Sequence, residues 1–320
     1  MSDKKTKVMA ALELPASVEA ELASRFDFRK SPVTRMTRDQ TLESAKGYPF
    51  VIVAPGIGVD RDFFARLPQI RALGTYSVGL DHVDLVVAKE LGIPVLNTPD
   101  VLTDATADVG MLLLLGASRR AREATAMIRN RDWPGWSPTQ LTGPQLKGRV
   151  LGIFGMGRIG RAIAERARGF GMRIAYHNRS RLTAELEQGA AFFDTKEALF
   201  DASDMVMIAA PGTRETAGIV NADLIGRLKP GGVLVNISRG DLVVDDDLIA
   251  ALESGHLFAA GLDVFKGEPD FDPRYAALPN VFATPHIGSA TVETRHAMGM
   301  CLVDGIAAIE AGEEPFNLVR

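Results

Sequence analysis

Three side chains with the capacity for chemistry, Arg239, Glu268 and His286, follow apolar runs in the last third of the chain. A guanidinium such as that of Arg239 can clamp a carboxylate through two parallel hydrogen bonds. The imidazole of His286 can exchange a proton with a carbonyl or hydroxyl oxygen. A Glu268 carboxylate bonded to that ring would orient it and favour its charged form. Together the three predict proton transfer on a small molecule that carries a carboxylate.

Short apolar runs alternate with helical patterns along almost the whole chain, and several runs are rich in Val and Ile. This pattern is typical of parallel strands buried on both faces, so it predicts an α/β fold with doubly wound parallel sheets. The carboxyl ends of such strands line the ligand crevice, where we expect Arg239, Glu268 and His286 to converge. The expected strands are Val8–Ala11, Phe50–Ala54, Ala72–Tyr76, Val95–Asn97, Val150–Phe154, Arg173–His177, Met205–Ala209, Gly232–Ile237, Ala259–Val264 and Val281–Thr284. The expected helices are Ser17–Ser24, Arg61–Arg66, Leu85–Leu91, Ala105–Arg129, Arg158–Phe170, Asn221–Leu228, Asp245–Ser254 and Ala290–Ala311.

A glycine-rich turn, Gly155-Met-Gly-Arg-Ile-Gly160, lies between an expected strand and an expected helix. That context is the one a dinucleotide-binding turn requires. Gly155 permits the tight turn, Gly157 lets a pyrophosphate approach the backbone, and Gly160 lets the helix pack closely on the strand. Free N–H groups at the start of the helix favour phosphates. The alternative is a glycine-rich turn that binds no ligand.

The end of the next expected strand distinguishes between dinucleotides. NAD sites usually carry Asp or Glu about 20 residues after the glycine turn, to hold the ribose 2′-hydroxyl. This chain instead reads Asn178-Arg179-Ser180-Arg181, with no acid among them. Two guanidinium groups and a hydroxyl suit a 2′-phosphate. The segment therefore favours NADP(H), with NAD(H) possible, and the alternative is a solvated basic turn.

Length and composition narrow the class of protein further. The chain has 320 residues, which corresponds to about two domains, and 46% apolar with 24% charged residues is ordinary for a globular protein. The net charge of −4 provides no excess of Lys and Arg for nucleic acid or an anionic membrane surface. Cys301 alone cannot form an internal disulfide, and Val109–Ala117 is too short to span a membrane. We expect a cytoplasmic protein without a metal, since no C-x-x-C or H-x-x-x-H spacing occurs.

Taken in order, these motifs resemble the D-isomer-specific 2-hydroxyacid dehydrogenases over essentially the whole chain. The matching segments are Ser77–His82, Asn97–Asp108, Gly155–Gly160, Arg239-Gly240, Gly261–Phe265, Glu268-Pro269 and Pro285–Ser289. Within the family, Tyr176–Ser180 resembles the NADPH-dependent glyoxylate/hydroxypyruvate reductases. Asp108 departs from a usual Glu, Leu80 from a common aromatic residue, and Ile237-Ser238 from a common pair of small residues. The first two departures leave the shape of the substrate pocket open.

The resemblance implies a flavodoxin-like substrate domain formed by residues 1–100 and 288–320. It implies a Rossmann dinucleotide-binding domain at residues 101–287, with the active site in the cleft between the two domains. It also implies a homodimer. Trp133 and Trp136 would lie near the dimer contact, where one of them would reach the active site of the partner subunit.

The resemblance also implies roles for individual residues. His286 would be the general acid in reduction, Glu268 its partner, and Arg239 the group that binds the substrate carboxylate and carbonyl. Ser77, Val78 and Gly79 would hold the substrate carboxylate, and Asp263 would lie beside the nicotinamide carboxamide. The implied cofactor-binding residues are Thr106, Gly155, Met156, Gly157, Arg158, Ile159, Gly160, Asn178, Arg179, Ser180, Arg181, Ala210, Pro211, Thr216, Ile237, Ser238, Asp263, His286 and Gly288.

The function expected from these features is transfer of a hydride from NADPH to glyoxylate or hydroxypyruvate, which gives a D-2-hydroxy acid. One alternative is reduction of a larger 2-oxo acid by the same chemistry. Another is a dinucleotide-sensing binding protein of the corepressor type, which shares the fold and much of the constellation. Turnover, as opposed to cofactor binding alone, would separate the enzyme from the sensor.

Overall fold

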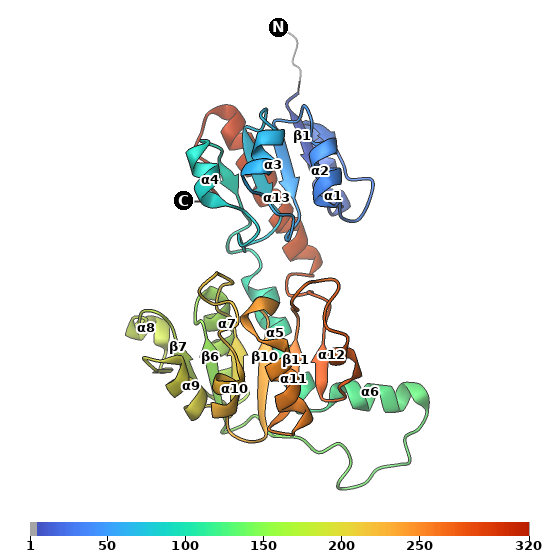
Figure 1. Ribbon diagram of the computed structural model, residues 1–320, viewed down its shortest axis with the longest axis vertical. Coiled ribbons are helices and arrows are strands. Elements are labelled where there is room, and N and C mark those ends of the chain that lie inside the picture. The colour runs from blue at the N-terminus through green and yellow to red at the C-terminus, as the bar shows by residue number, and fades with distance from the viewer. Residues whose placement is uncertain (1–4, 320) are drawn as a thin grey trace. The chain divides into compact units, whose positions relative to one another are not determined.

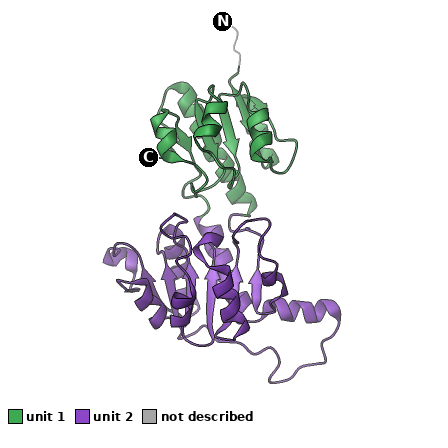
Figure 2. Ribbon diagram, in the orientation of Figure 1, with its two compact units in different colours: residues 1–102, 290–320 green, residues 103–289 purple. Residues whose placement is uncertain are grey.

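The computed structural model describes residues 5–319, and the chain folds as two compact units (Figure 2). Unit 1 comprises Met1–Leu102 and Ala290–Arg320, and unit 2 comprises Thr103–Ser289. Both junctions lie two residues later than the boundaries expected from the sequence. Residues 1–4 and 320 of the expected domains lie outside the described residues.

Unit 1 is built on a five-stranded parallel sheet in the order β2-β1-β3-β4-β5 (Figure 1). This is the flavodoxin-like order of a doubly wound sheet. Alternate strand residues enter two different apolar clusters, so both faces of the sheet are buried under helices. The strands are β1 (Lys7–Ala10), β2 (Asp27–Arg29), β3 (Phe50–Val53), β4 (Ala72–Thr75) and β5 (Val95–Leu96). The helices are α1 (Ala16–Arg25), α2 (Arg38–Ser44), α3 (Arg61–Arg66), α4 (Leu85–Glu90) and α13 (Val292–Ala311).

Unit 2 carries a seven-stranded parallel sheet in the order β12-β11-β10-β9-β6-β7-β8. Read from β8, its first six strands follow the Rossmann order, and β12 extends it. One face packs against α5 and α7, and the other packs against α9, α10 and α11. The strands are β6 (Val150–Phe154), β7 (Arg173–His177), β8 (Ala191–Phe192), β9 (Met205–Ile208), β10 (Gly232–Asn236), β11 (Leu257–Leu262) and β12 (Val281–Ala283). The helices are α5 (Thr103–Ser118), α6 (Ala121–Asn130), α7 (Arg158–Gly169), α8 (Ala184–Glu187), α9 (Lys196–Ala202), α10 (Ala222–Arg227), the short 3-10 helix Gly240–Leu242, α11 (Asp245–Glu253) and α12 (Arg274–Ala277).

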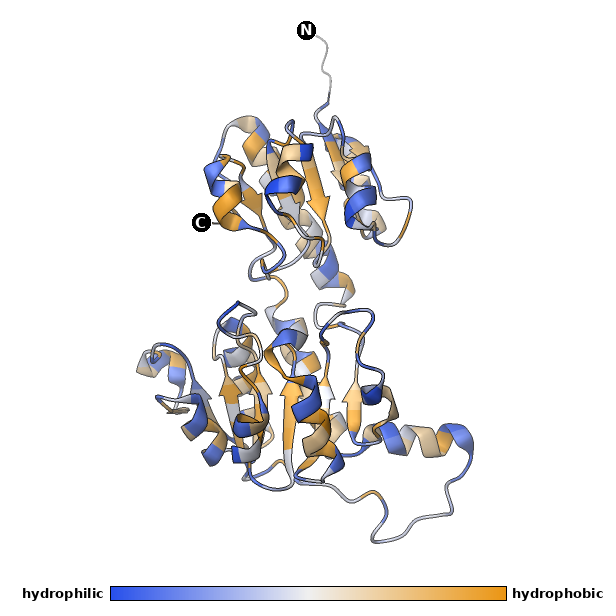
Figure 3. Cartoon of the chain, in the orientation of Figure 1, coloured by the Kyte–Doolittle hydropathy of each residue, from blue (hydrophilic) through white to orange (hydrophobic). Residues whose placement is uncertain are grey.

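Burial on both faces explains the apolar runs of the sequence, and Figure 3 shows hydrophobic residues along many of the strands in each unit. All residues of β3, β9 and β10 are buried. Short polar side chains begin several helices: the Asp60 carboxylate, for example, accepts a hydrogen bond from the Phe63 amide at the start of α3. Within the described residues, no helix is long and apolar enough to cross a membrane.

The expected single helix Ala105–Arg129 is wrong, because the structure divides it into α5 and α6. Arg120 breaks the helix with a left-handed φ of 54°. The break redirects the chain so that the Arg122 guanidinium donates hydrogen bonds to the Ala276 and Leu278 carbonyl oxygens. These contacts between distant segments leave no trace in the local helical pattern.

Candidate active site

A turn that begins at Thr284 is anchored on the carboxylate of Asp263, the residue that follows β11. Asp263 is 1% exposed, and its Oδ1 accepts hydrogen bonds from the Thr284 hydroxyl at 2.6 Å and the Ile287 amide at 2.8 Å. Its Oδ2 accepts the Gly288 amide at 2.8 Å. The His286 amide donates to the Asp263 carbonyl oxygen at 2.9 Å. One residue thus holds the whole turn.

This anchoring determines the backbone conformation of His286. Its φ of 53° lies in the left-handed region, which a non-glycine residue rarely adopts. Such a conformation persists where surrounding contacts over-determine it, as the bonds to Asp263 do here. Gly288 fits the close approach, because a Cβ there would lie 3.1 Å from Asp263 Oδ2. Burial raises the pKa of Asp263, and the hydrogen bonds from the turn partly offset that effect.

The anchored turn sets the His286 ring against Glu268. His286 Nδ1 lies 2.7 Å from Glu268 Oε2, while Glu268 Oε1 accepts the Phe265 amide at 2.7 Å. Burial alone would raise the pKa of Glu268, but the hydrogen bond and charge of His286 hold it below its usual value. An ionised carboxylate can only accept, so Nδ1 carries a proton toward Glu268. The exchangeable proton is then the one on Nε2, which bonds to no group in residues 5–319 that the structure describes.

Arg239 follows β10 and joins this pair. The Asn236 amide donates to the Arg239 carbonyl oxygen at 2.9 Å, and Asn236 Oδ1 accepts the Ser238 amide at 3.0 Å. A Cβ on Gly212 would come within 2.7 Å of Arg239 Cγ, so glycine makes room for the side chain. The positive charge of Arg239 acts to lower the pKa of Glu268. The structure therefore brings Arg239, Glu268 and His286 together at the carboxyl edge of the sheet in unit 2.

The glycine turn after β6 has the shape of a dinucleotide cradle. Gly155 has a φ of 98°, and a Cβ there would lie 2.4 Å from the Ala210 amide nitrogen. A Cβ on Gly160 would lie 2.6 Å from the Gly155 carbonyl oxygen. A Cβ on Gly157 would meet nothing within 4 Å, so this backbone faces open space. The three glycines fit the tight turn, the close packing and the approach of a pyrophosphate, respectively.

The other predicted cofactor residues of unit 2 lie at the same edge, at strand ends, in loops or in helices that begin there. The Thr216 hydroxyl donates to the Pro211 carbonyl oxygen at 2.8 Å, and the Ser238 hydroxyl donates to that of Ala210. Their contacts with a cofactor stay predictions, as does the contact of Asp263 with a nicotinamide. The remaining predicted cofactor-binding residues of this group are Thr106 in α5, Arg158 and Ile159 in the first turn of α7, and Ile237 after β10.

The segment after β7 divides into residues with different surroundings. Asn178 Oδ1 accepts the Met156 amide at 2.6 Å and so ties this segment to the glycine turn. Arg179 and Ser180 are exposed, and Arg179 forms no hydrogen bond or ion pair with the described residues. The Arg181 guanidinium instead pairs with Glu187 at the end of α8, at 2.8 Å between Nε and Oε1. Sequence reasoning missed this acid, because α8 folds it back from further along the chain.

In unit 1, the residues predicted to hold a carboxylate form the loop after β4. The Thr98 backbone amide donates to the Ser77 carbonyl oxygen at 3.0 Å, and the Asn97 side-chain amide donates to that of Val78 at 3.3 Å. The Ser77 hydroxyl donates to that of Gly79 at 2.7 Å. All three carbonyl oxygens are thus engaged. The amides of Val78 and Gly79 donate to no acceptor in the described part of the chain. This arrangement suits an anion nest.

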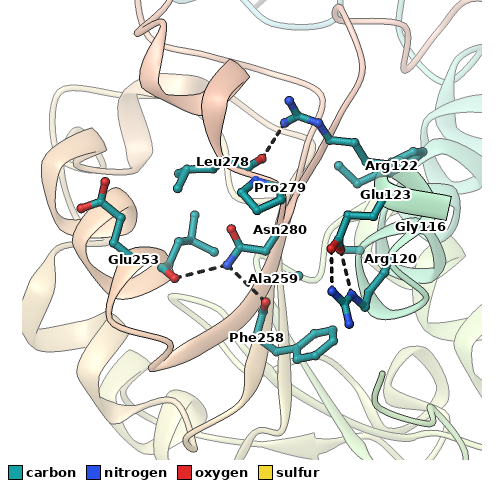
Figure 4. Close-up of a pocket in the computed structure, with 13 residues that line it drawn as sticks. Gly116, Arg120, Arg122, Glu123, Glu253, Phe258, Ala259, Leu278, Pro279 and Asn280 are labelled. Carbon is teal, nitrogen blue, oxygen red and sulfur yellow. Dashed lines mark hydrogen bonds and ion pairs between the residues drawn. The ribbon is translucent and has the colours of Figure 1, made fainter. Parts of the chain in front are cut away.

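A separate cavity of about 410 Å³ lies at the opposite end of β11 and β12, beside α6 (Figure 4). Most of its polar side chains, among them Arg120, Glu123 and Asn280, already have partners. Arg120 Nε and Nη2 bind both oxygens of Glu123 at 2.8 and 2.5 Å, and the Asn280 amide donates to the Leu252 carbonyl oxygen at 3.2 Å. The cavity therefore belongs to the packing of α6 and offers no chemistry to the residues at the carboxyl edge.

The strand order and the glycine cradle define unit 2 as a dinucleotide-binding Rossmann unit. Residues 111–288 match the family model for the NAD binding domain of D-isomer specific 2-hydroxyacid dehydrogenases. The chain is 40% identical to the glycerate dehydrogenase of Hyphomicrobium methylovorum over 314 residues, which cover 97% of this chain and 98% of that protein. It is 39% identical to the glyoxylate reductase of Pyrococcus furiosus over 322 residues, 99% of this chain and 96% of that protein.

A solved structure is also similar to this chain over nearly its whole length. It is the NADPH-dependent glyoxylate/hydroxypyruvate reductase of Sinorhizobium meliloti in complex with NADP and malonate. The identity is 33%, the TM-score is 0.88, and the match covers 98% of this chain and 97% of that one. The present chain belongs to the D-isomer specific 2-hydroxyacid dehydrogenase family. As a member, it is an NAD(P)-dependent enzyme that interconverts a 2-oxo acid and a 2-hydroxy acid.

The anchoring of the turn can be tested through Thr284→Val, which removes a hydroxyl donor and keeps the shape of the side chain. Loss of one hydrogen bond to a charged group should lower the free energy of unfolding by about 1.5–3 kcal/mol in urea denaturation at pH 7. Loss of the Thr284 hydroxyl also raises the pKa of Asp263 further. The difference in free energy of unfolding between the variant and the unaltered protein should therefore shrink as the pH falls and Asp263 takes up a proton. Thr142→Val, at an exposed position, is the control and should change stability by no more than about 0.5 kcal/mol. Equal effects of the two variants would refute the anchor.

Proposed function

We propose that the enzyme reduces a small 2-oxo acid, glyoxylate or hydroxypyruvate, to the D-2-hydroxy acid with NADPH. The observation that carries this proposal is the His286 ring, held by its Nδ1 on an ionised Glu268 beside Arg239 and at the same sheet edge as the glycine cradle. The names of the relatives, which include glyoxylate and hydroxypyruvate reductases, support the choice of substrate.

In this proposal, side chains and backbone amides of the enzyme bind the 2-oxo acid, and a side chain supplies the proton. The Arg239 guanidinium binds the substrate carboxylate and carbonyl oxygen, and the amides of Val78 and Gly79, with Ser77 holding their loop, bind the carboxylate. Bound NADPH supplies the hydride. His286 Nε2 donates its proton to the oxygen that becomes the hydroxyl, and Glu268 orients the imidazole through its bond to Nδ1.

Purified protein with NADPH should oxidise the cofactor in the presence of glyoxylate and hydroxypyruvate, and should form D-glycerate from hydroxypyruvate. His286→Ala should lower kcat about 10²–10⁴-fold, the usual contribution of a general acid. His256→Ala, just before β11 and so at the other end of that strand from Asp263, is the matched control. Cofactor binding without turnover of any 2-oxo acid would favour a sensor, and preference for larger acids would correct the substrate. A loss below tenfold in His286→Ala would contradict the proton role.

The proposed preference for NADPH rests on the segment after β7. Asn178, a neutral side chain, stands where an acid would bind a 2′-hydroxyl, and it is engaged with the glycine turn. Arg179 and Ser180 follow it as exposed donors, which suit a 2′-phosphate. No carboxylate lies among these three residues to repel the phosphate.

Arg179→Ala should weaken NADPH binding selectively. One charge-assisted hydrogen bond contributes about 1.5–3 kcal/mol, which at ~1.4 kcal/mol per decade is a loss of roughly 10- to 150-fold. The dissociation constant of NADH should stay nearly unchanged, as fluorescence titration would show. Arg173→Ala, at the other end of β7, provides the charge-matched control. Similar losses for the two cofactors would rule out a 2′-phosphate contact.

The proposed homodimer is supported by exposed apolar side chains on α6 and the segment after it, which stand out from unit 2 (Figure 1). None of the residues of α6 is buried. Ile128, Trp133 and Trp136 are 64%, 53% and 81% exposed. Large exposed apolar side chains within nine residues of the chain are typical of a protein interface. Light scattering should therefore give twice the chain mass of 34.4 kDa, and the mass of a single chain would contradict the dimer.

A further inference from the structure

A buried carboxylate lies beside the segment that we propose to recognise the cofactor. Glu187, the last residue of α8, is 6% exposed, and α8 lies next to β7 and β8 at the edge of unit 2 (Figure 1). Its Oε1 accepts hydrogen bonds from the Tyr176 hydroxyl at 2.7 Å and from Arg181 Nε at 2.8 Å. Its Oε2 accepts Arg181 Nη2 at 3.2 Å. Arg181 thus holds both oxygens of the carboxylate.

Tyr176 connects this pair to the backbone of the segment. It is fully buried in β7, and its hydroxyl accepts the Leu182 amide at 2.9 Å while donating to Glu187. The segment 177–181 is therefore closed at its base, between Tyr176 and Leu182. Arg179 lies at the middle of this closed loop. The Arg181 guanidinium also lies 5.8 Å from the centre of the Phe192 ring in β8, a cation–π contact that adds to its fixation.

The charges of Glu187 and Arg181 depend on one another. The hydrogen bond from Arg181, followed by that from Tyr176, holds the pKa of Glu187 below its usual value, so Glu187 is ionised at neutral pH. An ionised carboxylate without Arg181 would repel a phosphate bound to the neighbouring residues. With Arg181 paired to it, the local charge left for recognition is that of Arg179.

We propose that Glu187 and Arg181 form a positioning pair that sets cofactor specificity: Arg181 neutralises Glu187 and, with Tyr176, closes the loop that presents Arg179 and Ser180. Arg181 is then not a ligand of the 2′-phosphate, although its sequence position predicts one. This role rests on the proposed preference for NADPH. The positioning role and a ligand role differ in one consequence. In the positioning role, loss of Arg181 weakens binding of the 2′-phosphate because the charge of Glu187 is left unpaired.

A double-variant cycle separates the two roles without catalysis. Calorimetric titration with 2′,5′-ADP and with 5′-AMP measures the contribution of the 2′-phosphate alone. Arg181→Ala should lower the affinity ratio of these nucleotides about tenfold, because Glu187 then repels the added phosphate. Arg181→Ala combined with Glu187→Gln should restore the ratio to within about threefold of the unaltered protein, since the repelling charge is gone. Arg173→Ala is the control for loss of a positive charge and should leave the ratio unchanged.

The outcomes are distinct. A double variant as weak for 2′,5′-ADP as Arg181→Ala would show Arg181 to be a phosphate ligand and would overturn the positioning pair. An unchanged ratio in Arg181→Ala would overturn it as well. If the unaltered protein bound the two nucleotides equally, the proposed NADPH preference itself would fail, and the pair would lose its role in specificity. Thermal unfolding of each variant shows that the fold is retained, and Glu187→Gln alone confirms that loss of the carboxylate is tolerated.

Discussion

The turn that carries His286 depends on one buried carboxylate. Asp263 receives two amides and one hydroxyl from the turn, and its carbonyl oxygen receives the amide of His286. Hydrogen bonds to a charged group contribute about 1.5–3 kcal/mol each, whereas the left-handed backbone of one residue costs about 1–2 kcal/mol. The turn therefore tolerates His286 at a φ of 53°, and that conformation places its ring on Glu268. The desolvation that raises the pKa of Asp263 is the cost of this arrangement.

The same principle recurs in the two other segments that we propose to face a ligand: the named carbonyl oxygens and carboxylates are engaged by neighbours, and donors remain. The loop of Val78 and Gly79 has all its carbonyl oxygens bonded, and Glu187 is held by Arg181 and Tyr176. Such preorganised donors suit the anionic groups of a 2-oxo acid and a dinucleotide. In the proposed function, the enzyme would meet its ligands with these fixed dipoles and charges at the carboxyl ends of parallel strands.

Much of this could be predicted from the sequence, because it depends on local patterns. Buried strands require apolar runs, and a glycine turn between strand and helix indicates a dinucleotide cradle, so the α/β fold and the family are confirmed. What could not be predicted depends on contacts that the local sequence pattern does not encode. The break at Arg120 follows from bonds of Arg122 to residues more than 150 positions away, and Glu187 reaches Arg181 only through α8. The polar edge strand β2 has no apolar run to mark it.

The most direct test of this account is the pH dependence of reduction in Glu268→Gln. The variant keeps the size of the side chain and one hydrogen bond but removes the charge that favours the protonated imidazole of His286. With deuterated NADPH used to confirm that hydride transfer limits the rate, kcat/KM for the 2-oxo acid is measured across the pH range. The alkaline limb of the profile should move to lower pH in the variant. An unmoved alkaline limb would contradict the proposed role of Glu268 as the charged partner of His286.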